Sequence, residues 1–413
     1  MHIVLSGYFG YDNVGDEAIL FSIIRALRKL EPTVEITVLS NNPAETAATY
    51  GVNTVNRWNI GEIRSALKKA DGLISGGGSL MQDATSTKTI PYYAGIIKLA
   101  QMAKVPVFIY SQGMGPINGK LGKWLVKSVF NKSAGITVRD EDSSTLLRDI
   151  GVRLPVTVVP DPVVGLGGNE FTSPWLDEWL KTQFKADAEQ TELEEDVASL
   201  SASASVGKPD ADMTTMANDT MNGKDAATDD MQVSVTPPAY ITVSVRDWPS
   251  EVDFKKKIAE SLDLIATQEL HIVFIPMHGE HDVKASADVA ALMQSTSTIA
   301  PGDLSIEEKI AVIGGSKLLI GQRLHSLIFA GIEHIPFIAL SYDPKIDAFA
   351  NIAQQPVAGH VEKDDWTGQT LAELAFDILD DYEAKVATLI DIITPMQTAA
   401  ENTAQMALDA FTK

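Results

Sequence analysis

The 413-residue sequence predicts an α/β protein with two doubly wound parallel-sheet domains that face a cleft. Short β-branched segments alternate with amphipathic helical segments, which is typical of parallel sheets covered by helices on both faces. The alternation stops in an acidic low-complexity stretch and then starts again. The chain is also longer than the chains that usually fold around a single hydrophobic core, so two domains are expected.

The first domain is expected over residues 1–180. Its predicted strands are apolar, short and bounded by Gly, Pro, Asn or Asp, and they cover residues 3–6, 35–39, 72–75, 107–111, 136–139 and 156–159. Helical periodicity separates most of them, for example over residues 18–30 and 60–69. This order of strand, helix and strand predicts a Rossmann-like domain.

Residues 185–236 predict a disordered acidic linker. The segment holds twelve Asp or Glu and three Lys, which is −9 of the formal net charge of −22. It is rich in Ser, Ala, Thr, Asn and Met and shows no periodicity after about residue 200, a composition that cannot build a core.

The second Rossmann-like domain is expected over residues 237–385, with strands at 240–245, 271–275, 317–320 and 336–340. The tail reads as helical throughout from residue 371 to 411. Its last segment, 386–413, is expected to form a helix that crosses back onto the first domain.

The composition excludes several classes of function. The chain has no cysteine, so disulfides, thiolate metal ligands and a Cys nucleophile are ruled out. The net charge of −22 argues against binding nucleic acid, whose phosphates would be repelled. No apolar run reaches the length of a membrane span and the N-terminus lacks a secretion signal, so we expect a cytoplasmic location.

An anion site is predicted in the segment GQRLHSLIFAG. Arg323, His325 and the amide of Ser326 follow a short apolar strand, where a helix beginning near His325 would turn its positive end toward a ligand. Lys345 follows the next strand in SYDPK. The alternative is structural: Arg323 pairs with a nearby acid and His325 only caps the helix.

Three glycine-bearing loops follow strands of the first domain: SGYFGYDNVGDEAIL, GGGSLMQD and SQGMGP. Polar side chains and close backbone approach there suggest a pocket for the hydroxyl groups of a sugar, although ordinary strand-to-helix turns explain each loop as well. The spacing in the first loop does not match the dinucleotide fingerprint of NAD or FAD enzymes. The candidate acceptor-binding residues are Asp12, Asn13, Gly15, Asp16, Gly77, Gly78, Ser79, Gln82, Asp83, Gln112 and Asp161.

Two further arginines end predicted strands, Arg139 in VRDEDS and Arg246 in SVRDW, and both are expected to reach the cleft. The motif HGEHD resembles a metal site, but it lacks a third fixed ligand. We therefore expect cleft-lining or helix-capping roles for its residues and predict no metal.

Taken together, MHIVLSGYFGYDNVGDEAIL, SGGGSLMQD, SQGMGP, VRDEDS, VPDP, SVRDW, GQRLHS and SYDPK resemble the polysaccharide pyruvyltransferase family over nearly all of the chain. The similarity is closest to bacterial enzymes of the cell-surface-anchoring type, which modify the secondary cell wall polymers that anchor S-layers. It implies a fold like that of type B glycosyltransferases. The acidic insertion at 185–236 departs from the family pattern.

The resemblance implies that phosphoenolpyruvate is the co-substrate and that its enolpyruvyl unit forms a 4,6-ketal on a hexose, usually N-acetylmannosamine. It carries over Arg139, His325 and Lys345 as the phosphoenolpyruvate-binding and catalytic set, with Arg323 beside them. Arg246 and the helix N-terminus at Ser326 are further candidates for binding phosphoenolpyruvate. The chemistry needs anion clamps and a general acid, for which His325 is the candidate. Asp12, Asp83 or Asp161 could act on the acceptor hydroxyls, and no cofactor is expected.

Two other functions stay open. A nucleotide-sugar glycosyltransferase of the same architecture would use Arg246 and Arg323 as a diphosphate clamp, and a non-catalytic carbohydrate-binding protein would pair its cations structurally. The resemblance further implies an undecaprenyl-diphosphate-linked disaccharide as acceptor. Such an acceptor would place the protein at the inner face of the plasma membrane, where Lys120, Lys123 and Lys127 beside Trp124 could dock.

Overall fold

The computed structural model describes residues 1–84, 86–168, 170–183, 185 and 238–412. The chain divides into two compact units, Met1–Ser173 with Tyr240–Lys413, and Pro174–Ala239. In the second unit, residues 174–183 are helical and the rings of Trp175 and Trp179 stack. Apart from Lys185, the predicted linker at 185–236 lies outside the described residues.

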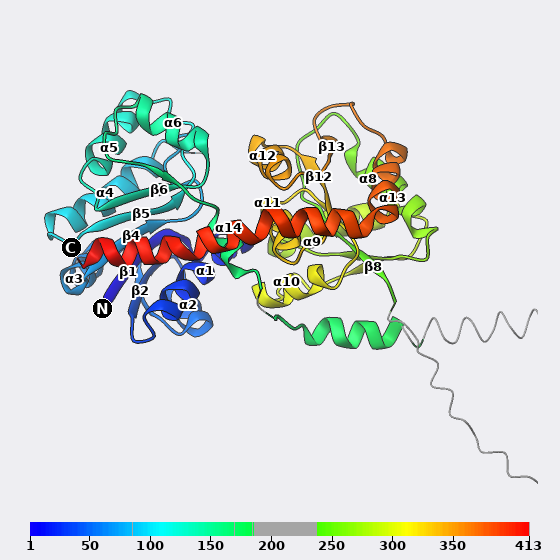
Figure 1. Cartoon of the computed structure of the whole chain (residues 1–413), viewed down its shortest axis with the longest axis horizontal. Helices are drawn as coiled ribbons and strands as arrows, with labels where there is room; N and C mark the ends of the chain where they lie inside the picture. The colour runs from blue at the N-terminus through cyan, green and yellow to red at the C-terminus, as the bar shows by residue number, and fades with distance from the viewer. Residues whose placement is uncertain (85, 169, 184, 186–237, 413) are drawn as a thin grey trace, which may run out of the picture. The chain divides into compact units, whose positions relative to one another are not determined.

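The first unit contains two parallel sheets (Figure 1). Within the described residues the first sheet has the strand order β3-β2-β1-β4-β5-β6-β7. Its strands are β1 His2–Phe9, β2 Glu35–Ser40, β3 Asn53–Asn56, β4 Gly72–Gly76, β5 Val107–Gln112, β6 Gly135–Val138 and β7 Thr157–Val158. The helices between them are α1 Val14–Leu30, α2 Pro43–Tyr50, α3 Ile60–Lys69, α4 Thr89–Met102, α5 Lys120–Phe130 and α6 Glu141–Asp149, followed by the 3-10 helix η1 Pro162–Leu166.

The second sheet has the order β10-β9-β8-β11-β12-β13 among the described residues. Its strands are β8 Tyr240–Ser244, β9 His271–Phe274, β10 Thr298–Ile299, β11 Leu319–Gly321, β12 Phe337–Ser341 and β13 Val357–His360. The helices are α8 Phe254–Ala266, α9 Gly279–Ala290, α10 Ile306–Gly314, α11 Leu324–Ile332, α12 Pro344–Ile352, α13 Gly368–Asp380 and α14 Tyr382–Phe411. In both sheets the strand order reverses beside the first strand, which is where α/β proteins bind ligands.

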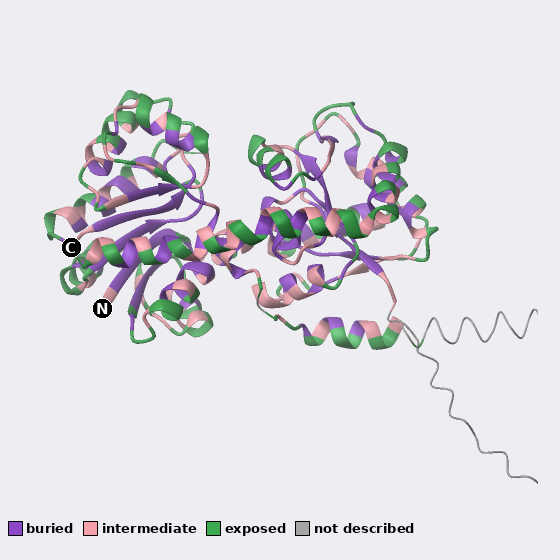
Figure 2. Cartoon of the chain, in the orientation of Figure 1, coloured by how far each residue is buried: buried purple, intermediate pink, exposed green. Residues whose placement is uncertain are grey.

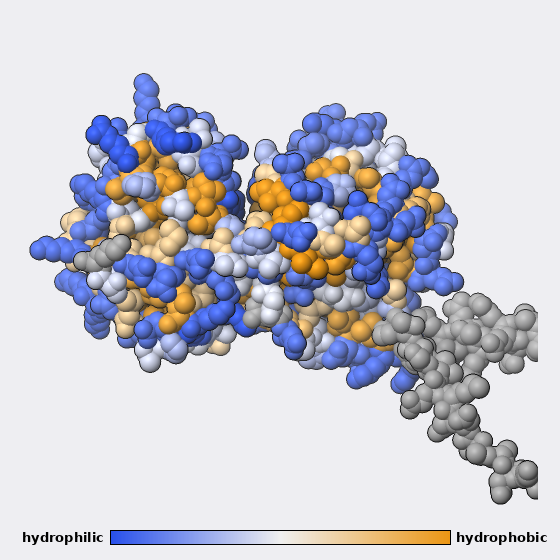
Figure 3. Space-filling model, viewed as in Figure 1, coloured by the Kyte–Doolittle hydropathy of each residue, from blue (hydrophilic) through white to orange (hydrophobic). Residues whose placement is uncertain are grey.

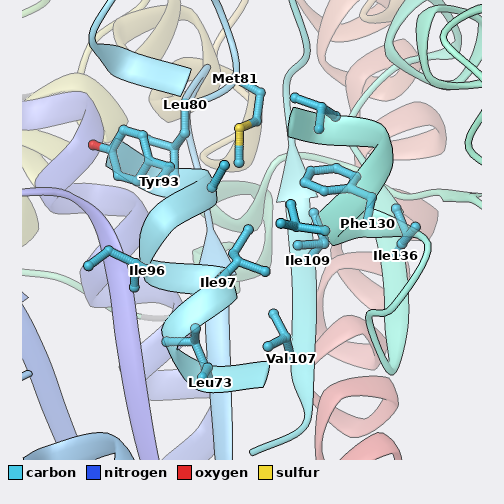
Figure 4. Close-up of a cluster of buried hydrophobic side chains, with 14 of the residues drawn as sticks. Leu73, Leu80, Met81, Tyr93, Ile96, Ile97, Val107, Ile109, Phe130 and Ile136 are labelled. Atoms are coloured by element: carbon cyan, nitrogen blue, oxygen red, sulfur yellow. The ribbon is translucent and has the colours of Figure 1, made fainter. Parts of the chain in front are cut away.

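The central strands are buried on both faces because helices cover each sheet (Figure 2). One core cluster packs Leu73 of β4 and Ile109 of β5 against Ile97 of α4 and Phe130 of α5 (Figure 4). A separate cluster under the second sheet contains Ile241 of β8 and Leu340 of β12. Continuous apolar strands of this kind are what a parallel sheet buried on both faces requires.

The predicted α/β class with two parallel sheets is confirmed. Every strand predicted from the sequence is present with shifted ends, whereas β3, β10 and β13 were not predicted. The strand β3 is a polar edge strand, β10 has two residues and β13 contains a glycine, so none shows a strong apolar pattern.

The predicted continuous helical tail is interrupted at Asp381, where α13 ends and α14 begins. Helix α14 contacts α1, β5 and β6 around the first sheet as well as α11 and α13 around the second (Figure 1). The side chain of Phe411, its last residue, packs so close to Gly72 at the start of β4 that a Cβ on this glycine would overlap the ring.

None of the helices in the described part of the chain combines the length and the apolar composition that crossing a bilayer requires. On the face drawn in Figure 3, hydrophilic side chains cover much of the surface and apolar groups gather in smaller patches between them.

Candidate functional site

A pocket of about 300 Å³ is lined by residues that follow strands of both sheets. The lining residues are Asn13, Gly15, Asp16, Gly78, Ser79, Arg139, Arg246, Met277, His278, Arg323, Leu324, His325, Tyr342 and Lys345. The structure therefore brings together most of the cationic residues predicted from the sequence. We refer to this space as the first pocket.

The turn between β1 and α1 forms one wall of the first pocket. The side chain of Asn13 caps α1 by accepting a hydrogen bond from the Gly15 backbone N–H at 3.1 Å. Gly15 lies directly against the His325 imidazole, and a Cβ at this position would overlap the ring. The glycine is thus explained by close approach of a side chain from the second sheet.

Arg139 lies one residue beyond β6 and is held by groups of the first sheet. Its Nη1 is 3.3 Å from Asp161 Oδ2, and its Nη2 donates to Ser79 Oγ at 3.1 Å. A Cβ on Gly113 would stand 2.8 Å from the Arg139 Nε, so the SQGMGP loop leaves room for the guanidinium. Arg139 is therefore oriented before any ligand arrives.

His325 is the second residue of α11, and Arg323 is the N-cap of that helix. The Nε2 atom of His325 is buried and has no hydrogen-bond partner among the described residues. Burial lowers the pKa of His325 to about 4, an effect that Asp161 opposes and Arg139 adds to. The residues around the imidazole therefore favour its neutral form at neutral pH.

Arg246 and Lys345 supply two more cations. Arg246 lies over the rings of Trp248 and Tyr342, 5.0 and 4.5 Å from their centroids, and its Nε is buried without a partner among the described residues. The Nζ of Lys345 is 3.2 Å from Asp343 and partly exposed. Among the described residues, Arg246 therefore has no carboxylate partner, and the Lys345 side chain is free enough to turn toward an anion.

Arg323 has the structural partner that the alternative interpretation foresaw. Its Nε donates to Asp282 Oδ2 at 2.9 Å and its Nη2 donates to the other carboxylate oxygen. Asp282 is 1% exposed and also accepts the Met277 backbone N–H. The HGEHD segment thus anchors Arg323 through Asp282. Within the described residues, no group of three or more His, Asp or Glu side chains is placed to hold a metal.

Asp16 is the acidic group of the first pocket. No hydrogen bond or ion pair reaches its carboxylate from the residues that the structure describes. Burial raises the pKa of Asp16 to about 7, an effect that Glu17 adds to and that Arg139 and Lys345 oppose. The pocket therefore contains an unpaired carboxyl group that changes charge near neutral pH.

Ser326 does not offer the free amide expected of it. Its backbone N–H donates to the Arg323 carbonyl at 3.0 Å and its Oγ donates to the same oxygen at 2.7 Å. The first turn of α11 satisfies both groups internally, so a ligand would have to displace those bonds.

Several predicted acceptor-binding residues lie elsewhere. Asp83 accepts hydrogen bonds from the backbone N–H groups of Asn118 and Gly119, which hold that loop. Asp12 is exposed and lines a different pocket, between α1 and α10. Gly77 and Gln112 line neither the first pocket nor the one adjoining it.

Gln82 and Asp161 line that adjoining pocket, together with Ser79, Arg139 and Lys345. Sequence reasoning did not select Tyr342, Asp140 or Asp142 as site residues, although all three stand inside motifs already singled out, SYDPK and VRDEDS. It also missed the role of Asp282, because a partner 41 residues away from Arg323 leaves no local signal.

Solved structures share this fold at low sequence identity. A UDP-GlcNAc 2-epimerase from Neisseria meningitidis bound to UDP-GlcNAc has a TM-score of 0.57 at 12% identity, covering 100% of both chains. A putative UDP-N-acetylglucosamine 2-epimerase from Listeria monocytogenes has a TM-score of 0.62 at 10% identity, covering 99% of this chain and 95% of the other. Anabaena Alr3699/HepE in complex with UDP-glucose has 0.56 at 11%, covering 100% and 99%.

No curated protein sequence matches the chain closely enough to indicate a relationship. The family model described as polysaccharide pyruvyl transferase matches residues 13–344, which contain all but one residue of the first pocket. With that match extending over most of the sequence, the chain belongs to the polysaccharide pyruvyl transferase family.

Proposed function

We propose that the chain transfers the enolpyruvyl group of phosphoenolpyruvate to a sugar, forms a 4,6-ketal and releases phosphate. The observation that carries this proposal is the charge of the first pocket. Four cations line it, against the single carboxylate of Asp16, and they are Arg139, Arg246, Arg323 and Lys345. A small molecule with a carboxylate and a phosphate group is complementary to that set.

The size of the pocket agrees with this donor. A volume of about 300 Å³ is sufficient for a three-carbon phosphate ester. The buried, unpartnered Nε2 of His325 and Nε of Arg246 also require a ligand or water, because buried polar atoms are nearly always hydrogen-bonded.

The reaction balances without an external acid or base. A proton adds to the methylene carbon of phosphoenolpyruvate, and a sugar hydroxyl attacks the cationic C2 and loses its proton. The bond between C2 and the phosphate oxygen then breaks, phosphate leaves with the bonding electrons, and the second hydroxyl attacks C2 and loses its proton. Of the two hydroxyl protons, one ends on the new methyl group and one on phosphate, so the protein only has to relay them.

Two side chains of the first pocket can relay these protons. We assign proton donation to the methylene carbon to His325, since a bound trianion raises the pKa of the imidazole and offsets the cations that lower it. Asp16 is the second relay group, because its unpaired carboxyl group exchanges a proton near neutral pH. The structure favours Asp16 over Asp83, whose oxygens already accept backbone hydrogen bonds.

The acceptor that we propose is N-acetylmannosamine of an undecaprenyl-diphosphate-linked disaccharide, as in the cell-surface-anchoring type of the family. This assignment rests on the resemblance of the motifs, taken together from MHIVLSGYFGYDNVGDEAIL to SYDPK, to that type. It would make the protein part of secondary cell wall polymer synthesis for S-layer anchoring, in the cytoplasm at the inner face of the plasma membrane. No cofactor is required by the chemistry.

The test is phosphate release from phosphoenolpyruvate by the full chain in the presence of methyl glycosides of N-acetylmannosamine, glucose and galactose. We expect release with at least one glycoside, and mass spectrometry should find the corresponding pyruvate ketal. The same glycosides with UDP-GlcNAc or UDP-glucose serve as the comparison. Release of UDP without any reaction of phosphoenolpyruvate would replace our proposal by a glycosyltransferase.

A further inference from the structure

A second pocket, of about 540 Å³, adjoins the first pocket within the same compact unit. The two pockets share Ser79, Arg139, Leu324 and Lys345. Loops after β4, β5, β6 and β7 form one wall, and α11, α12 and α14 form the other. A molecule in the second pocket therefore meets the first pocket at two of the cations proposed to hold phosphoenolpyruvate.

The charge of the second pocket is opposite to that of the first. Four carboxylates line it, against the cations Arg139 and Lys345, and they are Asp140, Asp142, Asp161 and Asp343. An anion placed there would face four carboxylates with only two cations beside it, so the net charge of the lining would repel it. The charges favour a neutral molecule with many hydroxyl groups, which donate hydrogen bonds to carboxylates.

The carboxylates differ in how much hydrogen-bonding capacity they have left. Asp140 caps α6 by accepting the Ser143 backbone N–H at 2.7 Å, and Asp161 accepts from Val163 at 3.1 Å. Asp142 is exposed, and no bond reaches its carboxylate from the residues that the structure describes. Asp142 can therefore accept hydroxyl hydrogen bonds without losing a partner.

Apart from Asp343 and Lys345 at the start of α12, the opposite wall of the second pocket is mostly apolar. It contains Ile328 of α11, Phe349 and Ile352 of α12 and Met396 of α14. Ile352 is 47% exposed, so part of this apolar wall is accessible to a ligand. A pyranose ring carries C–H faces, and an N-acetyl sugar carries a methyl group, so both would bury this surface.

We propose that the second pocket binds the acceptor sugar, with hydroxyl groups on the carboxylate wall and a C–H face on the apolar wall. This inference rests on the proposed function. It places the reacting hydroxyls at the junction of the two pockets, beside Ser79 and Arg139 and next to C2 of phosphoenolpyruvate. The charge of each pocket would thus direct the anionic donor to the first pocket and the neutral sugar to the second.

The first test compares Asp142→Ala with Glu141→Ala in the full chain. Both acids are exposed in the first turn of α6 and favour its N-terminus equally, but Glu141 lines neither pocket. With the methyl glycoside of N-acetylmannosamine, we expect Asp142→Ala to raise the acceptor KM about tenfold through lost hydroxyl bonds. The KM for phosphoenolpyruvate should stay within about twofold, and Glu141→Ala should change neither.

The second test fills the pocket. Ala348 is exposed on α12 and lines the second pocket, so Ala348→Trp is expected to fold and to occupy the sugar site. Ala287→Trp on α9 is the matched control, since Ala287 is also exposed and lines neither pocket. Calorimetric titration with phosphoenolpyruvate should give unchanged binding for both, whereas saturation-transfer NMR should lose the glycoside signal only with Ala348→Trp.

These measurements separate the two proposals. If Asp142→Ala and Ala348→Trp bind the glycoside as the unchanged protein does, the second pocket is not the acceptor site, whatever the donor is. A protein that binds the glycoside in this pocket but never reacts with phosphoenolpyruvate would overturn the proposed function and leave the sugar site standing. Failure of the unchanged protein to bind any of the three glycosides would also overturn this inference.

Discussion

The two sheets contribute different chemistry to the first pocket, although both are built from the same alternation of strand and helix. Loops of the first sheet bring glycines, short polar side chains and the Asp16 carboxyl group, with Arg139 as the single cation. Loops of the second sheet bring Arg246, Arg323 and Lys345 together with His325. We therefore expect the second sheet to carry most of the anion binding, whereas three of the four carboxylates of the second pocket follow strands of the first sheet.

The cations also differ in how they are held. Arg139 and Arg323 form ion pairs with the buried acids Asp161 and Asp282. Arg246 packs on aromatic rings, and Lys345 pairs with a half-exposed acid. An ion pair with a buried acid fixes the position of an arginine, but the acid already neutralises its charge. We therefore expect Arg246 and Lys345 to give more of the binding energy for an added anion.

The largest effect is expected for His325→Gln. This substitution keeps a polar side chain from the second sheet but removes the imidazole that we propose as the proton donor. We expect kcat to fall about 10³-fold with phosphate release as the readout, because general acid catalysis typically contributes 10²–10⁴. Phosphoenolpyruvate binding, followed by calorimetry, should remain. Near-normal turnover would show that the imidazole is not the proton donor.

The next largest effect is expected at Asp16, the carboxyl group that the first sheet contributes to the first pocket. Asp16→Asn keeps the shape of the side chain and removes the proton relay, so we expect kcat to fall about 10²-fold. The variant should also remove the increase in phosphoenolpyruvate KM that we expect as pH rises through about 7, where the unaltered Asp16 becomes negative and repels the trianion. Glu17, Asp161, Arg139 and Lys345 remain and act equally in both proteins.

Although Asp16→Asn is expected to lower kcat, we expect it to make the folded protein more stable. The folded-state pKa of Asp16, about 7, lies above the ordinary value of 3.8, so the stabilising contribution of the protonated group is complete below the ordinary value and is lost as pH rises through about 7. Asp16→Asn should therefore raise the free energy of unfolding by about 2–4 kcal/mol near pH 8 and by less near pH 5. Urea unfolding at the two pH values measures this, and an equal gain at both would contradict it.

A smaller effect separates the two kinds of cation. Arg246→Met should raise the KM for phosphoenolpyruvate about 10- to 100-fold and leave the melting temperature nearly unchanged, since no buried acid loses a partner. Arg323→Met should mainly lower the free energy of unfolding, by about 3–5 kcal/mol, because it leaves the buried Asp282 unpaired. If the double variant Arg323→Met with Asp282→Leu recovers stability but not the KM, Arg323 also binds the donor directly.

The sequence predicted the elements whose signals are local and missed what depends on distant parts of the chain. Apolar strands such as β4 and β5 and the glycines around Asp16 could be recognised in the sequence because strand burial and tight turns select residue types directly. The identity of Asp282 as the partner of Arg323 and the lowered pKa of His325 could not, since both depend on groups from other elements. The division of the candidate acceptor residues between two pockets likewise depends on how loops from both sheets meet.

The smallest effect concerns the exposed face of α5, where Lys120, Lys123 and Lys127 surround Trp124. Trp124 is 62% exposed, whereas Val126 and Phe130 of the same helix are buried in the core, so only one face is available to a membrane. We expect the triple Lys→Glu variant to lose cosedimentation with vesicles containing anionic lipid, at about 1 kcal/mol per lysine, and to keep its activity on soluble glycosides.

The control is a triple Lys→Glu variant at Lys68, Lys69 and Lys104, which are exposed lysines on α3 and in the loop after α4. It changes the net charge equally, so a general electrostatic effect would reduce cosedimentation of both variants alike. Loss confined to the α5 variant would show that the membrane contact belongs to one face of the first-sheet domain. Equal cosedimentation of both variants with the unaltered protein would exclude α5 as a docking surface, and the lipid-linked acceptor would then have to reach the second pocket without it.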